Sequence, residues 1–253
     1  MRSATRVKGH PTPLDRLEVP RWNRSRLAAA VVLASWSVMF WFLLLSGRVN
    51  LYLSTRTSWV VPVGAVTLGA AAIGVFAVSR TRASHAINRR DAFVSAVLIL
   101  PVILVMSSPR TTLGTFSASR KTQFSGRGLW TYWGTFNKDS DISLFFVAAA
   151  TYWPQANDLL AQRAGSDVDF VGFVDREPST PADEFTLTRF VVSCCVADAA
   201  VVSIRVVNVP PGQVTQDQWV EVTGQIYPIG SEMILTATSI APVQTPQVPY
   251  LTP

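Results

Sequence analysis

The sequence predicts a membrane protein in two parts: three N-terminal transmembrane helices, followed by an all-β domain built as an OB-like five-stranded barrel with short flanking helices. Three observations support this fold class. Uninterrupted apolar runs fill much of the chain before residue 108. From residue 168 to residue 240, apolar and polar residues tend to alternate, which is the period of a β-strand. The hydrophobic fraction of 49% is high, and the charged fraction of 15% low, for a soluble protein.

The apolar runs cover residues 27–47, 58–79 and 92–108, and they follow a basic tail over residues 1–26. About 20 helical residues cross a hydrocarbon core, so the first two runs are long enough to span a bilayer. The third, which contains Pro101, lies at the lower limit of that length. A cleaved signal peptide is an alternative for the first run, but its length and the lack of a small-x-small cleavage pattern favour an uncleaved anchor. The second run is rich in Gly and Ala, which favours close helix packing.

Loop charges predict the orientation of these spans. The tail carries seven Lys and Arg residues and the second loop four, whereas the first loop carries two. Because cytoplasmic loops are enriched in Lys and Arg, we expect the tail and the second loop in the cytoplasm. Three spans of a multi-pass cell-membrane protein then place a linker (109–139), the β domain (140–241) and a Pro-rich tail (242–253) outside the cytoplasm. If the third run did not span, the β domain would be cytoplasmic.

The β domain is predicted from five alternating runs separated by turn-forming segments rich in Pro and Gly. Five consecutive strands in so short a stretch suit a small closed barrel of the OB type. Gly172 and Gly224 occupy the same position in two similar segments, and a mid-strand glycine indicates a bend or bulge at a barrel corner. The expected strands cover residues 168–175, 184–195, 200–207, 219–227 and 233–240.

Two short helices are expected before the first of these strands. Ser140 and Asp141 are predicted to cap a helix through Leu144 to Val147, which Pro154 ends. A second helix is expected over residues 155–163. Both are too short to span a membrane, so they are expected to pack on the barrel.

The charge distribution excludes nucleic acid as a partner of the β domain. Residues 1–127 carry 17 basic and 3 acidic side chains, a net charge of +14, whereas residues 128–253 carry 5 and 13, a net charge of −8. The basic residues therefore belong to the membrane part, where they set orientation. An acidic domain repels phosphates.

The residues most suited to chemistry are Cys194 and Cys195, the only cysteines of the chain. Neighbours on a strand point to opposite faces, so both can bind one metal ion only if the strand ends there and turns. Three interpretations follow: two structural thiols, a metal site formed by one or both thiolates with Asp198, or a redox-active or intermolecular disulfide. Zinc accepts thiolate and carboxylate ligands. The only histidines, His10 and His85, lie in predicted cytoplasmic parts, which excludes a Cys/His zinc site in the β domain.

No constellation predicts an enzyme. Without a histidine in the β domain, a Ser-His-Asp triad cannot form there, and the chain has no Gly-rich phosphate loop or dinucleotide fingerprint. Arg189 follows Asp183 and Glu184 closely, which is typical of a solvated or paired surface charge.

Three segments resemble one known family: FVGFV over residues 170–174, RFVVSCCVAD over residues 189–198, and WVEVTG over residues 219–224. They are similar to the YcgQ-like bacterial proteins, which are described as predicted permease subunits, and the resemblance covers most of the chain. It implies an accessory role beside a multi-spanning permease of a kind linked to metal or metalloid export. The matching positions are Cys194, Cys195 and Asp198. Where the family typically has a proline soon after this element, Ala199-Ala200-Val201 follows here.

These observations together predict an accessory membrane subunit. Its helices would lie in the lipid bilayer and dock a multi-spanning permease subunit, and its extracytoplasmic domain would gate the permease or present a substrate such as a metal ion. The alternative is a membrane-anchored metal-binding or redox-sensing domain that uses Cys194, Cys195 and Asp198, with zinc as the candidate metal.

Overall fold

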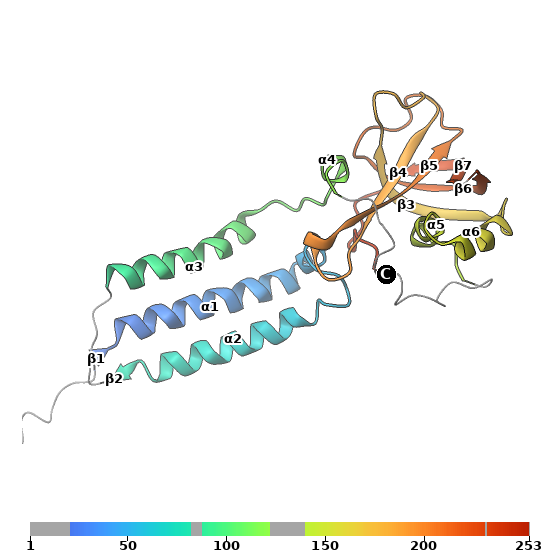
Figure 1. Ribbon diagram of the computed structural model, residues 1–253. Coiled ribbons are helices and arrows are strands. Elements are labelled where there is room, and N and C mark those ends of the chain that lie inside the picture. Colours follow the sequence, from blue (N-terminus) through green and yellow to red (C-terminus); the bar gives the residue numbers. More distant parts are fainter. Residues whose placement is uncertain (1–20, 82–87, 122–139, 231, 253) are drawn as a thin grey trace, which may run out of the picture. The chain divides into compact units, whose positions relative to one another are not determined.

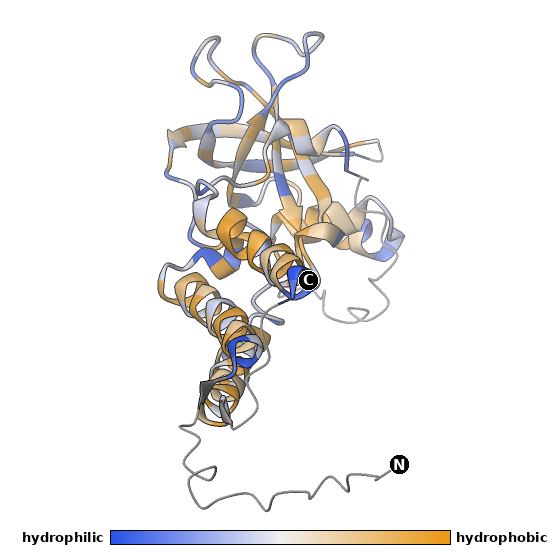
Figure 2. Cartoon of the chain, turned by 90° about the vertical axis from the view of Figure 1, so that its left-hand side faces the viewer, coloured by the Kyte–Doolittle hydropathy of each residue, from blue (hydrophilic) through white to orange (hydrophobic). Residues whose placement is uncertain are grey.

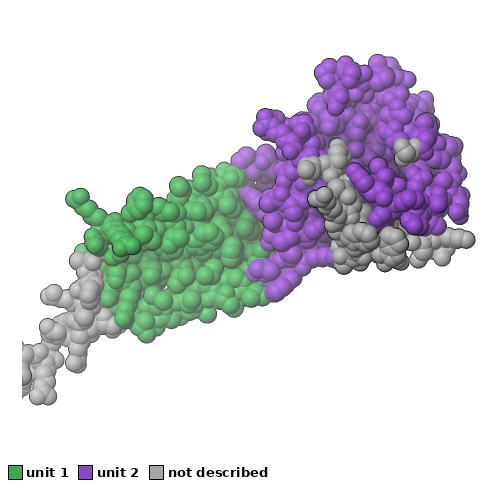
Figure 3. Space-filling model, in the orientation of Figure 1, with its two compact units in different colours: residues 1–44, 61–108 green, residues 45–60, 109–253 purple. Residues whose placement is uncertain are grey.

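The structure is a computed structural model that describes residues 21–81, 88–121, 140–230 and 232–252. The chain forms two compact units (Figure 3). The helical unit comprises Met1–Leu44 and Val61–Ser108, and the barrel unit comprises Leu45–Val60 and Pro109–Pro253. The segment between the first two long helices therefore belongs to the barrel unit.

The helical unit contains the three predicted helices, α1 (Arg24–Leu45), α2 (Val60–Ala77) and α3 (Arg89–Ser107) (Figure 1). Each is long and apolar enough to cross a membrane, so the prediction of three such helices is confirmed. The helix α3 begins at residue 89 rather than 92 because Asn88 and Asp91 form a capping box there. Two short strands pair antiparallel: β1 (Arg21–Trp22), which precedes α1, and β2 (Arg80–Thr81), which follows α2.

Small residues of α2 are used for packing inside this unit. A Cβ atom added at Gly64 would lie 2.8 Å from the Phe40 ring of α1, so only glycine allows this approach. Beside it, the Ser37 hydroxyl donates a hydrogen bond of 2.7 Å to the Ala65 carbonyl oxygen. The Gly/Ala-rich face predicted for helix packing thus contacts α1 of the same chain.

The outer surface of the helices is apolar (Figure 2). Trp36 of α1 donates from its indole N–H to the Leu98 carbonyl oxygen of α3 at 3.0 Å. Apart from Val102, the described side chains of α3 are not buried within the chain. A surface of this composition suits contact with lipid or with other apolar helices.

The barrel contains the five predicted strands: β3 (Asp167–Asp175), β4 (Phe185–Val191), β5 (Ala200–Val207), β6 (Trp219–Ile229) and β7 (Glu232–Pro242). They close in the order β3-β4-β5-β7-β6. The β5–β7 pair is parallel and the other pairs are antiparallel. The expected OB-like five-stranded barrel is therefore confirmed.

The predicted bulge is found at Gly224, whereas Gly172 lies in a continuous stretch of strand pairing and marks a close approach of the backbone instead. The register of β6 against β7 shifts between Thr223 and Gly224, which marks the bulge. At Gly172, an added Cβ atom would lie 2.7 Å from the Thr188 carbonyl oxygen of β4. The two similar segments pair with each other through β3 and β6, in the register that sets Gly172 opposite Val220.

Two short helices, α5 (Leu144–Ala150) and α6 (Pro154–Ala161), pack on the barrel, and every residue of α5 is buried. The predicted cap at Ser140 and Asp141 is wrong by a few residues. Ser143 is the N-cap, since its hydroxyl accepts a hydrogen bond of 3.1 Å from the Phe146 amide. The apolar faces of α5 and α6 join the barrel interior in one core.

A second apolar cluster lies outside that core and includes Phe173, Phe190, Trp219 and Tyr250. Tyr250 comes from the C-terminal tail, which returns along the end of β4. The buried helix residue Ala118, from α4 (Thr115–Ala118), also joins this cluster. Part of the segment predicted as a linker therefore packs against the barrel.

Arg189 does not behave as the solvated or paired charge predicted from the sequence. Its guanidinium group is half-buried and donates to the carbonyl oxygens of Pro249 at 3.0 Å, Val248 at 2.9 Å and Val171 at 3.3 Å. Burial lowers the pKa of this guanidinium. Arg189 therefore holds the C-terminal tail against the barrel.

Candidate metal site

The two cysteines lie in a turn rather than on a strand. The strand predicted over residues 184–195 extends four residues too far at its C-terminal end, because β4 ends at Val191. The carboxylate of Asp198 accepts hydrogen bonds from the amides of Ser193 at 3.0 Å, Cys194 at 2.7 Å and Cys195 at 3.2 Å. These bonds bend the backbone into a short helical turn, η4 (Val196–Asp198). We call residues 193–198 the cysteine turn.

The cysteine turn gathers three candidate ligand atoms. The Sγ atoms of Cys194 and Cys195 and a carboxylate oxygen of Asp198 all lie within 4.8 Å of one another. The condition stated for a shared metal ion is therefore met, because the strand ends at Val191 and the chain turns over Val196–Asp198, so the two thiols do not lie on opposite faces of a strand. Two sulfur ligands of a tetrahedral zinc ion, each at about 2.3 Å, lie about 3.8 Å apart, so side-chain rotations that bring the three atoms closer together would let them bind one ion.

The ionisable groups of the turn repel one another when they carry negative charge. The pKa of the exposed Cys194 thiol is raised by partial desolvation and then by Cys195 and the Asp198 carboxylate. A metal ion relieves this repulsion, since it stabilises the thiolates and the carboxylate together. An ionised carboxylate offers about four acceptor positions, and the three backbone amides leave Asp198 about one for a metal.

The segment between α1 and α2 is hydrogen-bonded to this turn. Leu53 and Cys195 form an antiparallel bridge, and the Ser54 amide donates to the Cys194 carbonyl oxygen at 3.1 Å. The Thr57 hydroxyl donates to the same oxygen at 2.6 Å. We call residues 52–57 the docking segment. Two further bonds join it to the turn, from the Ser54 hydroxyl to the Ser193 carbonyl oxygen at 2.9 Å and from the Val196 amide to the Tyr52 carbonyl oxygen at 2.8 Å.

Sequence reasoning missed the docking segment. Its contacts with the turn join residues more than 130 positions apart, and no periodicity reports such a pairing. The only available signal is the group of hydroxyl side chains, Ser54, Thr55 and Thr57, between two spans.

Lys121 adds a positive charge beside the same turn. Its ammonium group donates to the carbonyl oxygens of Val196 at 3.1 Å and Ala197 at 3.0 Å. This cation offsets part of the negative charge that the thiolates and Asp198 acquire when they ionise.

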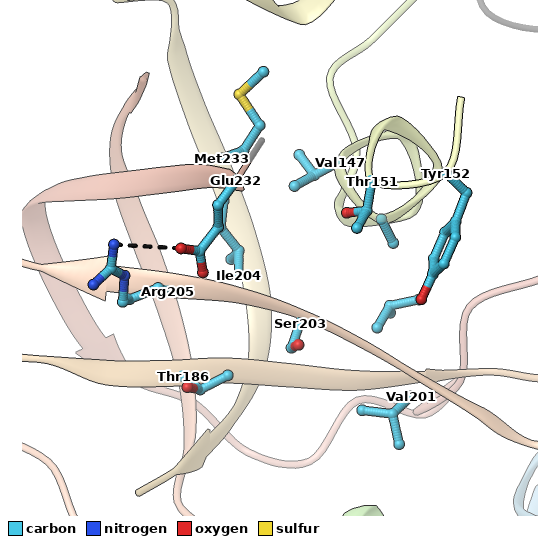
Figure 4. A pocket seen from close by; sticks show the side chains of 12 residues that line it. Val147, Thr151, Tyr152, Thr186, Val201, Ser203, Ile204, Arg205, Glu232 and Met233 are labelled. Atoms are coloured by element: carbon cyan, nitrogen blue, oxygen red, sulfur yellow. Dashed lines mark ion pairs between the residues drawn. The ribbon is translucent and has the colours of Figure 1, made fainter. Parts of the chain in front are cut away.

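A separate groove of about 280 Å³ lies between α5 and β5 (Figure 4). Arg205, the one cation among the described residues that line it, forms ion pairs with Glu232 at 3.4 Å and Glu184 at 3.7 Å, so its charge is balanced. OB barrels bind oligonucleotides and oligosaccharides on the equivalent strands, but a neutralised cation gives little attraction for a phosphate backbone. The described residues that line the groove include no histidine or cysteine. The other described lining side chains come from α5, the turn that follows it, β4, β5 and β7, among them Val147, Thr151, Tyr152, Thr186, Ser203 and Met233.

Residues 151–253 match the family model of the DUF1980 C-terminal domain. The matched range contains the whole barrel and the cysteine turn. This finding is consistent with the resemblance to YcgQ-like proteins. Comparison with curated proteins gives no match.

Proposed function

We propose that this chain is an accessory subunit of a multi-spanning permease, and that its barrel unit presents a thiophilic metal ion at the cysteine turn. One observation carries the proposal: three ligand atoms converge on a solvent-accessible turn that is hydrogen-bonded to the segment joining two predicted spans. An ion bound at this turn could therefore shift the position of the segment that joins α1 and α2.

The ligand set suits transfer of an ion more than permanent storage. Structural zinc sites are closed by four protein ligands, whereas sites that exchange a ligand keep a position open. Cys194, Cys195 and Asp198 supply three ligands, and two of the three residues are exposed. The thiolates select zinc and other soft ions over magnesium or calcium.

The docking segment supports an extracytoplasmic position for the barrel. It lies between α1 and α2 and is bonded to the cysteine turn, so it lies on the same side of the membrane as the barrel. The chain reaches the barrel through α3, which returns to that side only if α3 also spans. The distribution of Lys and Arg then supports an extracytoplasmic position for that side.

Partnership with a permease is supported by the family resemblance and by the surface of the helical unit. Only Val102 of α3 is buried, although the helix is apolar enough to span. Such a helix offers a face to another membrane protein without disturbing the packing of α1 on α2.

The redox alternative has weaker support. Reactive cysteines have a lowered thiol pKa, so that the thiolate forms at neutral pH. The pKa of Cys194 is raised. This direction is the reverse of that expected for a reactive Cys194 thiol.

Two experiments test the two parts of the proposal. For the permease, the full-length chain is purified from native membranes in mild detergent and its companions are identified by mass spectrometry. A stoichiometric multi-spanning protein supports the accessory role, and recovery of the chain alone contradicts it.

For the metal, the same preparation is dialysed against zinc and its metal content is measured. Wild type is expected to hold about one ion per chain, with loss in Cys195→Ser. Ser193→Ala is the matched control, because it changes the same turn without removing a ligand atom. Equal metal content in all three proteins contradicts the site.

A further inference from the structure

A second site lies in the barrel unit, in a cavity of about 420 Å³. Two arginines line it, and among the described lining residues none is acidic. Its volume falls in the range of small-ligand pockets, about 300–1,000 Å³. The polar residues among its described lining are Ser46, Arg48, Asn50, Arg110, Thr112, Thr245 and Gln247.

Both arginines follow directly on predicted spans. Arg48 lies three residues after Leu45, the last residue of α1, and Arg110 lies three residues after Ser107, the last residue of α3. At about 1.5 Å per residue, α1 is about 33 Å long and α3 about 28 Å, close to the thickness of a hydrocarbon core. Residues just beyond such helices enter the layer of lipid headgroups. Leu45 itself lines the cavity.

The walls of the cavity are held by hydrogen bonds between segments distant in sequence. Arg110 donates from Nη2 to the Ser46 carbonyl oxygen at 2.9 Å, which fixes the guanidinium beside the end of α1. Asn50 donates to the Gln247 carbonyl oxygen at 3.3 Å. Gly47 adopts a positive φ of 69°, which turns the chain from α1 into the short helix η2 (Arg48–Leu51). The second arginine is thereby brought to the same cavity.

We propose that this cavity binds the phosphate of an anionic phospholipid headgroup. A guanidinium group offers five donors in a planar fork that matches phosphate oxygens, and the bond to Ser46 leaves several donors of Arg110 for a ligand. The amide and hydroxyl side chains of Asn50 and Thr112 suit the hydroxyl groups of a glycerol headgroup, and the apolar Leu45 and Leu51 suit the start of the acyl chains. The chemistry recognised is a phosphate anion, and the position at the span ends selects the lipid over free phosphate.

The site does not depend on metal binding, and its test uses the full-length chain. The chain is placed in nanodiscs of phosphatidylcholine with increasing phosphatidylglycerol, and bound phosphatidylglycerol is counted by native mass spectrometry. Surface charge alone changes affinity about fivefold per arginine, so the double variant Arg48→Gln/Arg110→Gln, which also removes the donors of the cavity, is expected to bind the lipid more than about 25-fold more weakly. Arg56→Gln is the control for surface charge alone, because it removes one charge from the loop that holds Arg48 and does not line the cavity, and it should weaken binding by no more than about fivefold.

Three outcomes decide the question. A loss per removed charge that is clearly larger in the double variant than in Arg56→Gln supports the site. The same loss per removed charge in both overturns it, because diffuse surface charge then explains the binding. Displacement of the lipid by millimolar inorganic phosphate without a preference for phosphatidylglycerol also overturns it. Arg110→Lys covers the case in which the double variant fails to fold: it keeps the charge, removes the planar fork and is expected to bind with intermediate affinity.

Discussion

The carboxylate of Asp198 organises the cysteine turn, and Asp198→Asn tests this role. In the wild type, Oδ1 accepts from the Ser193 amide and Oδ2 from the amides of Cys194 and Cys195. The asparagine amide nitrogen cannot accept a hydrogen bond, so at least one of the three bonds is lost and the others lose their charge.

The expected cost follows from these contacts. Removal of a capping side chain costs about 0.5–2 kcal/mol, and solvent partly replaces the acceptor because Asp198 is exposed. We expect about 1 kcal/mol for Asp198→Asn and about 2 kcal/mol for Asp198→Ala. Since 1.4 kcal/mol is a tenfold change in an equilibrium, local opening of the turn becomes about fivefold and about 30-fold more frequent.

Amide hydrogen exchange of the full-length chain in detergent measures this opening. The peptide that covers the cysteine turn should exchange faster in both variants, whereas peptides from β5 should exchange as in the wild type. Unchanged exchange at the amides of residues 193–195 would refute the reasoning, because the carboxylate would then not hold the turn.

The same variant separates two effects on the thiols. Asp198→Asn removes one of the groups that raise the pKa of Cys194, so this pKa falls and more thiolate is present at neutral pH. Alkylation of Cys194 near pH 7 should therefore become faster. Metal affinity should instead fall, because a ligand is lost. In the wild type, affinity should rise with pH through the raised pKa, since binding requires thiolates.

Three further predictions concern the stability of the barrel unit, which contains the cysteine turn. Arg189→Met should remove three hydrogen bonds to backbone carbonyls and cost about 2–4 kcal/mol, seen as early proteolytic cleavage of the C-terminal tail, whereas Arg189→Lys keeps the charge and should cost less. Ser143→Ala should remove the cap on the Phe146 amide and lower the free energy of unfolding by about 0.5–2 kcal/mol, and unchanged thermal unfolding would contradict that role. Gly172→Ala should cost about 1–3 kcal/mol, because its new methyl group would meet the Thr188 carbonyl oxygen at 2.7 Å; a wild-type denaturation midpoint would disprove the close approach.

The sequence was sufficient to predict the spans and the barrel, because both depend on local patterns. An apolar run of about 20 residues has few alternatives to a spanning helix. Alternation located all five strands within a few residues, except at the end of β4. The two similar segments with a central glycine also located the bulge at Gly224. A glycine within a strand marks a close approach of the backbone, whichever strand supplies the neighbour.

The site was harder to predict because its geometry depends on contacts that no pattern records. The alternation continues through Val192 into the cysteines, and only the carboxylate of Asp198 shows that the strand has already ended. The docking segment is joined to the turn across more than 130 residues. Arg189 likewise donates to carbonyl oxygens about 60 residues further along the chain. The acidic residues that precede it in sequence therefore gave no sign of its partners.

The central claim is that the cysteine turn binds a thiophilic cation. The most direct measurement is a titration of the full-length chain in mild detergent with cadmium, a thiophilic probe, followed by thiolate-to-metal charge-transfer absorption. We expect saturation at about one ion per chain, loss of the band in both Cys194→Ser and Cys195→Ser, and protection of both thiols from alkylation. A spectrum without a charge-transfer band, with both thiols alkylated equally fast in the presence and absence of cadmium, would contradict the claim.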